Sequence, residues 1–245
     1  MAMHPNWPIT LLSDLRLGTS TMVRHSAFAA AAKLVRGTLA LAVRRVPWLS
    51  IVLAAPLAAV WLLFAAANFI SWQRTDQPTG LGATMLELTI AVFFVIRRPA
   101  VVTSSSPLAW SATAVATFGV LAGRPGEEPL WGLEPVYAAL QLVGLVLALA
   151  SIAALGRSFG LVAANRGIRT GGPYRLVRHP LYAAYFVTQA GYVLETPTVR
   201  NVAIMVAVIT FQLVRVRTEE RCLSADPAYA AYRERVRWRL VPHVY

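Results

Sequence analysis

Long apolar stretches alternate with short polar ones along most of this chain. Six apolar segments occupy residues 47–70, 81–96, 108–122, 135–155, 180–194 and 201–214. A helix needs about 20 apolar residues to cross the roughly 30 Å hydrocarbon layer of a bilayer. The alternation therefore predicts an all-α integral membrane protein with about six membrane segments.

The fifth and sixth apolar segments are short, at about 15 residues each, and only residues 195–200 separate them. Such a pair predicts a helical hairpin. A hairpin returns the chain to the face that it left, so we expect residues 178–182 and 215–221 to meet at one face of the membrane. Asp226 and Pro227 follow as a suitable cap and first residue of a C-terminal helix.

The composition agrees with a membrane protein. Charged residues make up 14% of the chain, against roughly 25% in soluble domains. The net charge of +12 could indicate a nucleic-acid binder. The basic residues lie between the apolar segments rather than on one soluble face, so we expect the lipid bilayer and no nucleic acid as partner. Cys222 is the only cysteine, which rules out an intrachain disulfide.

Basic loops alternate with loops that carry no net positive charge. The basic ones are residues 1–46, 97–107, 156–179 and 215–245, and the others are residues 71–80, 123–134 and 195–200. Cytoplasmic loops are enriched in arginine and lysine. The alternation therefore predicts a protein of the cell membrane with both termini and the 156–179 loop in the cytoplasm.

The chain divides into three parts. Residues 1–46 predict a basic segment that forms an amphipathic helix on anionic lipid, or else a poorly ordered charged leader. Residues 47–155 hold the first four apolar segments. Residues 156–245 hold the hairpin and a C-terminal helix, and form the candidate catalytic and cofactor-binding region on the cytoplasmic side.

Candidate chemistry concentrates in residues 166–185, RGIRTGGPYRLVRHPLYAAY. Gly171, Gly172 and Pro173 break any preceding helix, and Pro180 suits the first turn of a new one, so His179 lies at a loop-to-helix junction. The hairpin brings Glu219 and Glu220 toward it. Carboxylates beside histidine, arginines and tyrosines suit a zwitterionic ligand with an aromatic base, such as S-adenosylmethionine.

This set of residues resembles the integral-membrane methyltransferases, which include the isoprenylcysteine carboxyl methyltransferases and the phospholipid N-methyltransferases. GPYRLVRHPLY, a glutamate pair, a Y-x-x-Y and a terminal R-L-V-P carry the resemblance. Ala184 replaces the glycine of the family pattern. The resemblance implies S-adenosylmethionine as cofactor, and we expect it to contact Tyr174, Arg178, His179, Pro180, Tyr182, Glu219, Glu220, Tyr229 and Tyr232.

The acceptor that the resemblance implies is a hydrophobic or lipid-like molecule, with a carboxylate favoured. Arg215, Arg217 or Arg233 would orient a carboxylate, whereas an amine would need Glu219 or Glu220 to take its proton. Arg215 and Glu219, four residues apart, can also pair on one helix face. An alternative is a sterol-reductase-like enzyme that uses NADPH and shares an R-H-P hairpin.

Glu87 is an acidic residue inside the second apolar segment. A carboxyl group in mid-membrane is costly unless it is protonated, paired or hydrated. We expect Glu87 near the edge of its short segment, with a place in a substrate tunnel as the alternative. No metal site is predicted.

Overall fold

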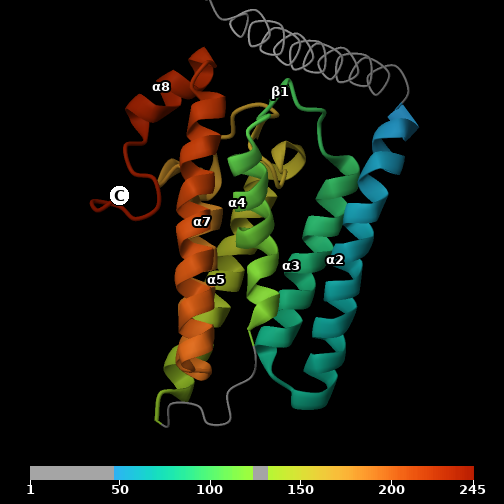
Figure 1. The fold of residues 1–245 in the computed structure, drawn as a ribbon, viewed down its shortest axis with the longest axis vertical. Coiled ribbons are helices and arrows are strands. Elements are labelled where there is room, and N and C mark those ends of the chain that lie inside the picture. Colours follow the sequence, from blue (N-terminus) through green and yellow to red (C-terminus); the bar gives the residue numbers. More distant parts are fainter. Residues whose placement is uncertain (1–46, 124–131) are drawn as a thin grey trace, which may run out of the picture. The chain divides into compact units, whose positions relative to one another are not determined.

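The computed structural model describes residues 47–123 and 132–245, with side chains from Ala54 onward (Figure 1). The predicted basic segment 1–46 lies outside these residues. In chain order the structure contains α2 (Pro47–Thr75), α3 (Pro78–Ile96), β1 (Val102–Thr103), α4 (Pro107–Phe118), η1 (Gly119–Ala122), α5 (Glu134–Leu155), η2 (Gly156–Ser158), β2 (Ala164–Asn165), η3 (Gly172–Arg175), α6 (Pro180–Glu195), α7 (Val199–Leu223) and α8 (Pro227–Arg235).

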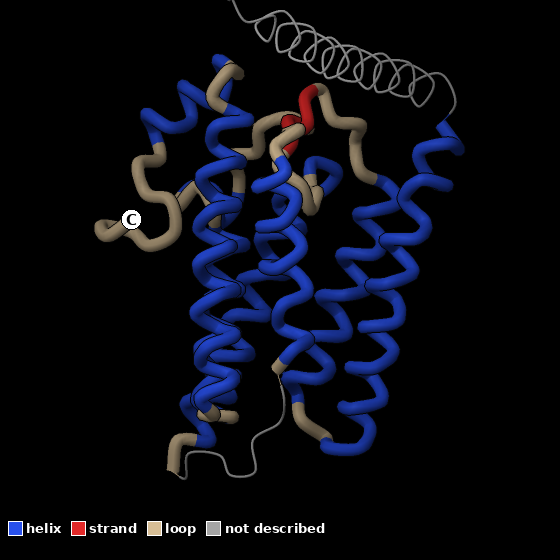
Figure 2. Tube along the Cα trace, viewed as in Figure 1, coloured by secondary structure: helices blue, strands red, loops and turns tan. Residues whose placement is uncertain are grey.

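All six predicted apolar segments form helices, and the two short strands are the only sheet in the described part (Figure 2). Within these same residues, four helices are long and apolar enough to cross a membrane: α2 from Ala54, α3, α5 with η2, and α7. The apolar helix that α4 forms with η1 is shorter, and α6 has 16 residues. The all-helical membrane class is confirmed, while the count of six spans is not.

The short helices nevertheless run between the same two ends of the unit formed by residues 51–245. At one end β1 pairs with β2, and we call this the site end. At the other end the Arg200 side chain donates hydrogen bonds to the carbonyl of Ala122, the last residue of η1. There Gln141 Nε2 also donates to Glu195 Oε2 over 2.7 Å, where α6 ends. The loops at residues 97–107 and 156–179 thus share one end, as their charges predicted.

Helices α5 and α6 pack closely because two glycines lie between them. A Cβ atom on Gly144 would lie 2.6 Å from the Thr188 backbone nitrogen, and one on Gly191 would lie 2.7 Å from the Tyr137 carbonyl oxygen. Real Cβ atoms do not approach so closely, so only glycine allows this helix contact. The contact fixes α6, and with it His179 at the start of α6.

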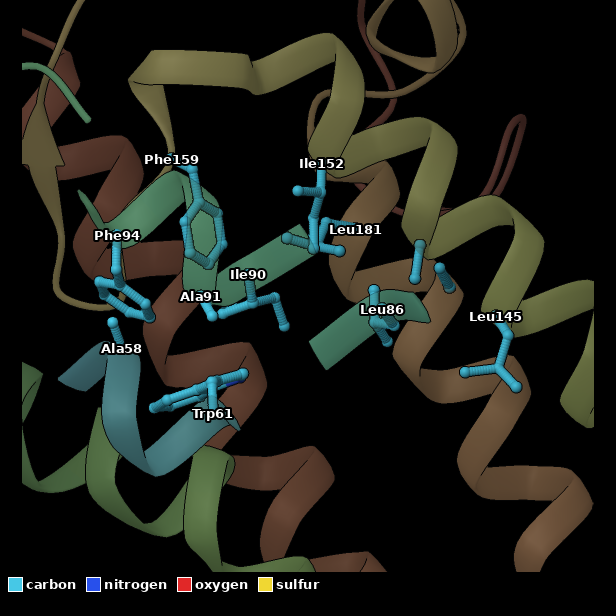
Figure 3. Close-up of a cluster of buried hydrophobic side chains, with 12 residues drawn as sticks. Ala58, Trp61, Leu86, Ile90, Ala91, Phe94, Leu145, Ile152, Phe159 and Leu181 are labelled. Carbon is cyan, nitrogen blue, oxygen red and sulfur yellow. The ribbon is translucent and has the colours of Figure 1, made fainter. Parts of the chain in front are cut away.

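Aromatic packing anchors the loop after α5 to the bundle (Figure 3). The Phe159 ring meets the Phe94 ring edge-on at 5.5 Å between centroids, and Phe94 in turn contacts Trp61 at 5.2 Å. Phe94 is fully buried. Burial of large aromatic side chains is a major stabilising contribution. The loop that carries the candidate chemistry is therefore held by α2 and α3.

Glu87 lies at the centre of α3 rather than near its edge. The helix begins at Pro78, before the apolar run, and ends at Ile96, nine residues beyond Glu87. The prediction that Glu87 lies near an edge was wrong. Hydropathy excludes Pro78 and Thr79, but both belong to the helix and lengthen it on the N-terminal side of Glu87.

Candidate functional site

A buried ion cluster joins the start of α6 to α7. Glu220 Oε1 accepts a hydrogen bond from Arg178 Nε and forms an ion pair with Arg178 Nη2, each over 2.8 Å, and it lies 3.4 Å from His179 Nε2. Glu220 Oε2 accepts from Arg239 Nε over 2.9 Å. Both oxygens of this carboxylate are therefore occupied by neighbouring cations. The hairpin brings residues 178–179 and 220 together, as its geometry predicted.

The C-terminal segment docks on the same cluster. The backbone N–H groups of Arg178 and His179 donate to the carbonyls of Trp238 and Arg239, over 2.9 and 2.8 Å. Arg178 Nη1 also donates to the carbonyls of Val236 and Arg237. Arg178 thus uses its whole guanidinium to hold α7 and the segment after α8 against the R-H-P motif.

Glu219 has different surroundings from its neighbour. The Tyr182 hydroxyl donates to Glu219 Oε2 over 2.7 Å. The Tyr182 ring stacks on His179 with 5.6 Å between centroids, and the Arg215 guanidinium lies 5.0 Å from the centre of the Tyr182 ring. Glu219 is partly exposed, so its carboxylate remains accessible to a ligand.

Arg215 does not pair with Glu219 in the described structure. Its Nη1 donates to Gln212 Oε1 over 3.1 Å, and its Nη2 donates to the Leu161 carbonyl over 2.7 Å. Arg215 is buried, and these two acceptors satisfy its guanidinium in place of the Glu219 carboxylate. The four-residue spacing allows the pair, but in the structure the loop after α5 supplies the acceptor instead.

A cavity of about 490 Å³ extends from this cluster along the inside of the helices. Its lining on α7 runs from Asn201 to Glu219, eighteen residues or about 27 Å of helix. Six predicted site residues line it: Tyr174, Arg178, His179, Tyr182, Arg215 and Glu219. Cavities of this size with a few convergent polar groups are typical of sites for small molecules and cofactors.

The other predicted residues lie outside this cavity. Arg217 is exposed, and Arg233 lines a separate, open hollow with Arg178, Glu234, Arg237 and Arg239. Pro180 is the first residue of α6. Tyr229 and Tyr232 are buried against Tyr174, and the Tyr232 hydroxyl donates to the Tyr174 carbonyl over 2.7 Å. Burial and then the nearby Glu219 hold the pKa of Tyr174 well above its usual range, so this phenol stays neutral.

Sequence reasoning missed Arg166 as a site residue and counted it only as a loop charge. Arg166 lines the cavity, its Nε has no hydrogen-bond partner among the described residues, and its guanidinium lies over Gly160. Burial, and then the charge of Arg97, lower its pKa to about 10. No spacing or motif marks this residue, because its approach to the cavity depends on Gly160 having no side chain.

Arg239 and Asn165 were missed as well. Arg239 belongs to the terminal R-L-V-P that carried the resemblance, which was the available signal. Asn165 Nδ2 donates to Asp226 Oδ2 over 2.7 Å, while Asp226 Oδ1 caps α8 by accepting from the Ala228 N–H. The predicted cap at Asp226 is confirmed, and β2 holds it in place.

The fold and the site define a helical membrane protein with a mixed-charge cavity at one end of its bundle. Residues 136–227 match the model of the phospholipid methyltransferase family. This segment contains α5 from Val136 onward, α6, α7 and the R-H-P motif, and the match confirms the resemblance to the membrane methyltransferases. No curated protein matches the chain.

Proposed function

We propose that this protein transfers a methyl group from S-adenosylmethionine to a hydrophobic or lipid-like acceptor. One observation carries the proposal: the cavity end lined by Tyr182, Glu219 and Arg166 lies within the segment that matches the methyltransferase family. The site end, in this proposal, faces the cytoplasm, because the basic loops gather there.

The residues present fit the cofactor's chemical groups. Glu219 would hold the ammonium group or the ribose diol, and the unpartnered Nε of Arg166 would hold the carboxylate. Tyr174 and Tyr182 would cover the aromatic base. Bound there, S-adenosylmethionine supplies a methyl group on a sulfonium that is already a good leaving group.

The protein's own residues then have to position the acceptor and exclude water. Arg215 lines the cavity beside Tyr182, which suits the orientation of an acceptor carboxylate. Arg217 and Arg233 are less suited, because neither lines the cavity. A lipid amine is the second candidate acceptor, favoured by the name of the matched family, and Glu219 would then take its proton.

Glu220 would act through its neighbours in this proposal. Both of its oxygens are held by Arg178, His179 and Arg239. It would keep His179 and the C-terminal segment in place, with Pro180, Tyr229 and Tyr232 as further supports, while Glu219 touches the ligand.

Calorimetric titration of the detergent-purified protein tests the proposal. We expect S-adenosylhomocysteine to bind and NADPH not to bind. Glu219→Gln should weaken binding at least tenfold because it removes the charge that faces the ammonium. Binding of NADPH alone would assign the protein to the reductases instead, and equal affinity in the Glu219→Gln variant would remove Glu219 from the site.

A further inference from the structure

Glu87 places a carboxyl group in the middle of an apolar helix. It lies nine residues from each end of α3, a helix long and apolar enough to cross the membrane. A carboxyl at that depth is costly and rarely kept without a role. Glu87 lines the main cavity, and its Oε2 atom is buried without a hydrogen-bond partner among the described residues.

Two further residues that line the same cavity each have an unpartnered oxygen atom. These atoms are Thr117 Oγ1 on α4 and Gln189 Oε1 on α6, both buried and without a hydrogen-bond partner in the described part of the chain. Buried polar atoms are normally paired, and an unpaired one costs free energy. Each of the three oxygens is able to accept a hydrogen bond, so a bound group that donates hydrogen bonds would satisfy them.

The three residues lie at similar distances from the site ends of their helices. Glu87 precedes the site end of α3, at Ile96, by nine residues, and Gln189 follows the site end of α6, at Pro180, by nine. Thr117 follows the first residue of α4, Pro107, by ten. At 1.5 Å per residue all three lie about 14–15 Å inside their helices. Gln189 is seven residues, or about 10 Å, beyond Tyr182 on α6.

We propose that Glu87, Thr117 and Gln189 form a polar subsite that binds a hydrogen-bond-donating group inside the hydrophobic part of the acceptor. The identification of the occupant as the acceptor rests on the proposed methyltransferase function. The acceptor then carries one polar group at the methyl-transfer end, near Tyr182, and a second, such as a hydroxyl, about 10 Å deeper. A plain hydrocarbon chain would leave the three oxygens unpaired.

The subsite also implies a function for α3 and α4, which lie outside the segment that matches the family. Glu87 and Thr117 precede residue 136, where the family match begins. Selection of the acceptor would therefore come mainly from α3 and α4, while α5 to α7 supply the cofactor end. A site built to bind a donor discriminates strongly against the analogue that lacks it.

The test compares two fatty-acid probes that differ by one hydroxyl: stearate, and stearate hydroxylated at its tenth carbon. Each is titrated by calorimetry into the full-length protein in detergent, without cofactor. We expect the hydroxylated probe to bind about tenfold more tightly, the gain from one added hydrogen bond to a buried acceptor. Glu87→Leu should abolish this preference, and Glu87→Gln, which keeps an acceptor oxygen, should retain most of it.

Two controls separate recognition from folding and from the cofactor site. Glu87→Leu places an apolar residue in mid-membrane and should melt at or above the wild-type temperature, with unchanged affinity for S-adenosylhomocysteine. Equal binding of the two probes to the wild type, or a preference that survives in Glu87→Leu, would overturn the subsite. Loss of preference with a lower melting temperature would also overturn it, because Glu87 would then be structural. Failure of the wild type to bind S-adenosylhomocysteine would contradict the methyltransferase proposal alone, since the probe preference is measured without cofactor.

Discussion

Glu219 and Glu220 are adjacent in one helix yet face different chemistry. Glu220 lies among Arg178, Arg239 and His179, with a side-chain exposure of 10%. Glu219 lines the cavity and has the Tyr182 hydroxyl as its hydrogen-bond partner. Successive residues on an α-helix point in directions about 100° apart. This difference lets Glu220 face the arginines while Glu219 faces the cavity.

This difference predicts opposite effects of the two alanine variants. Glu220→Ala should lower the free energy of unfolding by about 3–5 kcal/mol, because it leaves the buried Arg178 unpaired. Glu219→Ala should change stability little and weaken S-adenosylhomocysteine binding. Thermal unfolding in detergent and calorimetry on both variants check this. A stable Glu220→Ala protein would show that the ion cluster does not hold the site together.

Arg166 offers a second prediction at the scale of a residue. The Nε atom of the half-buried Arg166 is itself buried and unpartnered, which costs free energy in the unliganded protein. Arg166→Met should therefore keep or raise the melting temperature while weakening S-adenosylhomocysteine binding at least tenfold. Arg175→Met, an exposed change in the same loop, is the matched control and should alter neither quantity. Unchanged affinity in Arg166→Met would assign the cofactor carboxylate to another group.

At the scale of the elements, hydropathy located the helices well, because a chain in lipid must satisfy its backbone hydrogen bonds within each segment. It located their ends poorly. Helix α7 continues to Leu223, nine residues past the predicted limit, because the charged residues that end the apolar run remain helical. Those added turns carry Arg215, Glu219 and Glu220, so the site lies on the part of the helix that hydropathy alone would leave out.

The site itself was predictable only where its residues are contiguous or follow a motif. His179, Tyr182 and the glutamate pair were found in this way. The contact of Arg239 with Glu220 and the approach of Arg166 to Gly160 depend on which segment reaches which helix, and no sequence spacing encodes that. The residues with unpartnered oxygens lie on α3, α4 and α6, and that these three helices line one cavity is not encoded in any sequence spacing.

Close packing of α5 on α6 gives a prediction at the scale of an element. Gly144→Ala adds a methyl group that would meet the Thr188 backbone nitrogen at 2.6 Å, so one helix must shift. We expect a loss of roughly 1–3 kcal/mol in the free energy of unfolding, and weaker S-adenosylhomocysteine binding because α6 carries Tyr182. Gly171→Ala is the control, since a Cβ atom there would contact nothing within 4 Å. Equal melting temperatures for the two variants would argue against a tight α5–α6 contact.

For the whole molecule, the question is which compartment the site end faces. The antiparallel pairing of Val102 with Asn165 joins two basic loops at that end, and Arg217, Arg233 and Arg237 lie exposed in the same C-terminal region. The loop between α2 and α3 lies at the opposite end and carries no net positive charge. Basic loops stay in the cytoplasm during insertion, so the charge pattern predicts that the site end faces the cytoplasm.

Because Cys222 is the only cysteine in the chain, Cys222→Ser gives a background for labelling that tests this orientation. Gln77 and Ser105 are both exposed, one in the loop between α2 and α3 and the other in the loop between β1 and α4. In intact cells a membrane-impermeant maleimide should label Gln77→Cys at once, whereas Ser105→Cys should react only after permeabilisation. The reverse pattern would place the site end outside the cell and would contradict the proposed use of S-adenosylmethionine there. Labelling of both positions in intact cells would mean that the helices between them do not separate two compartments.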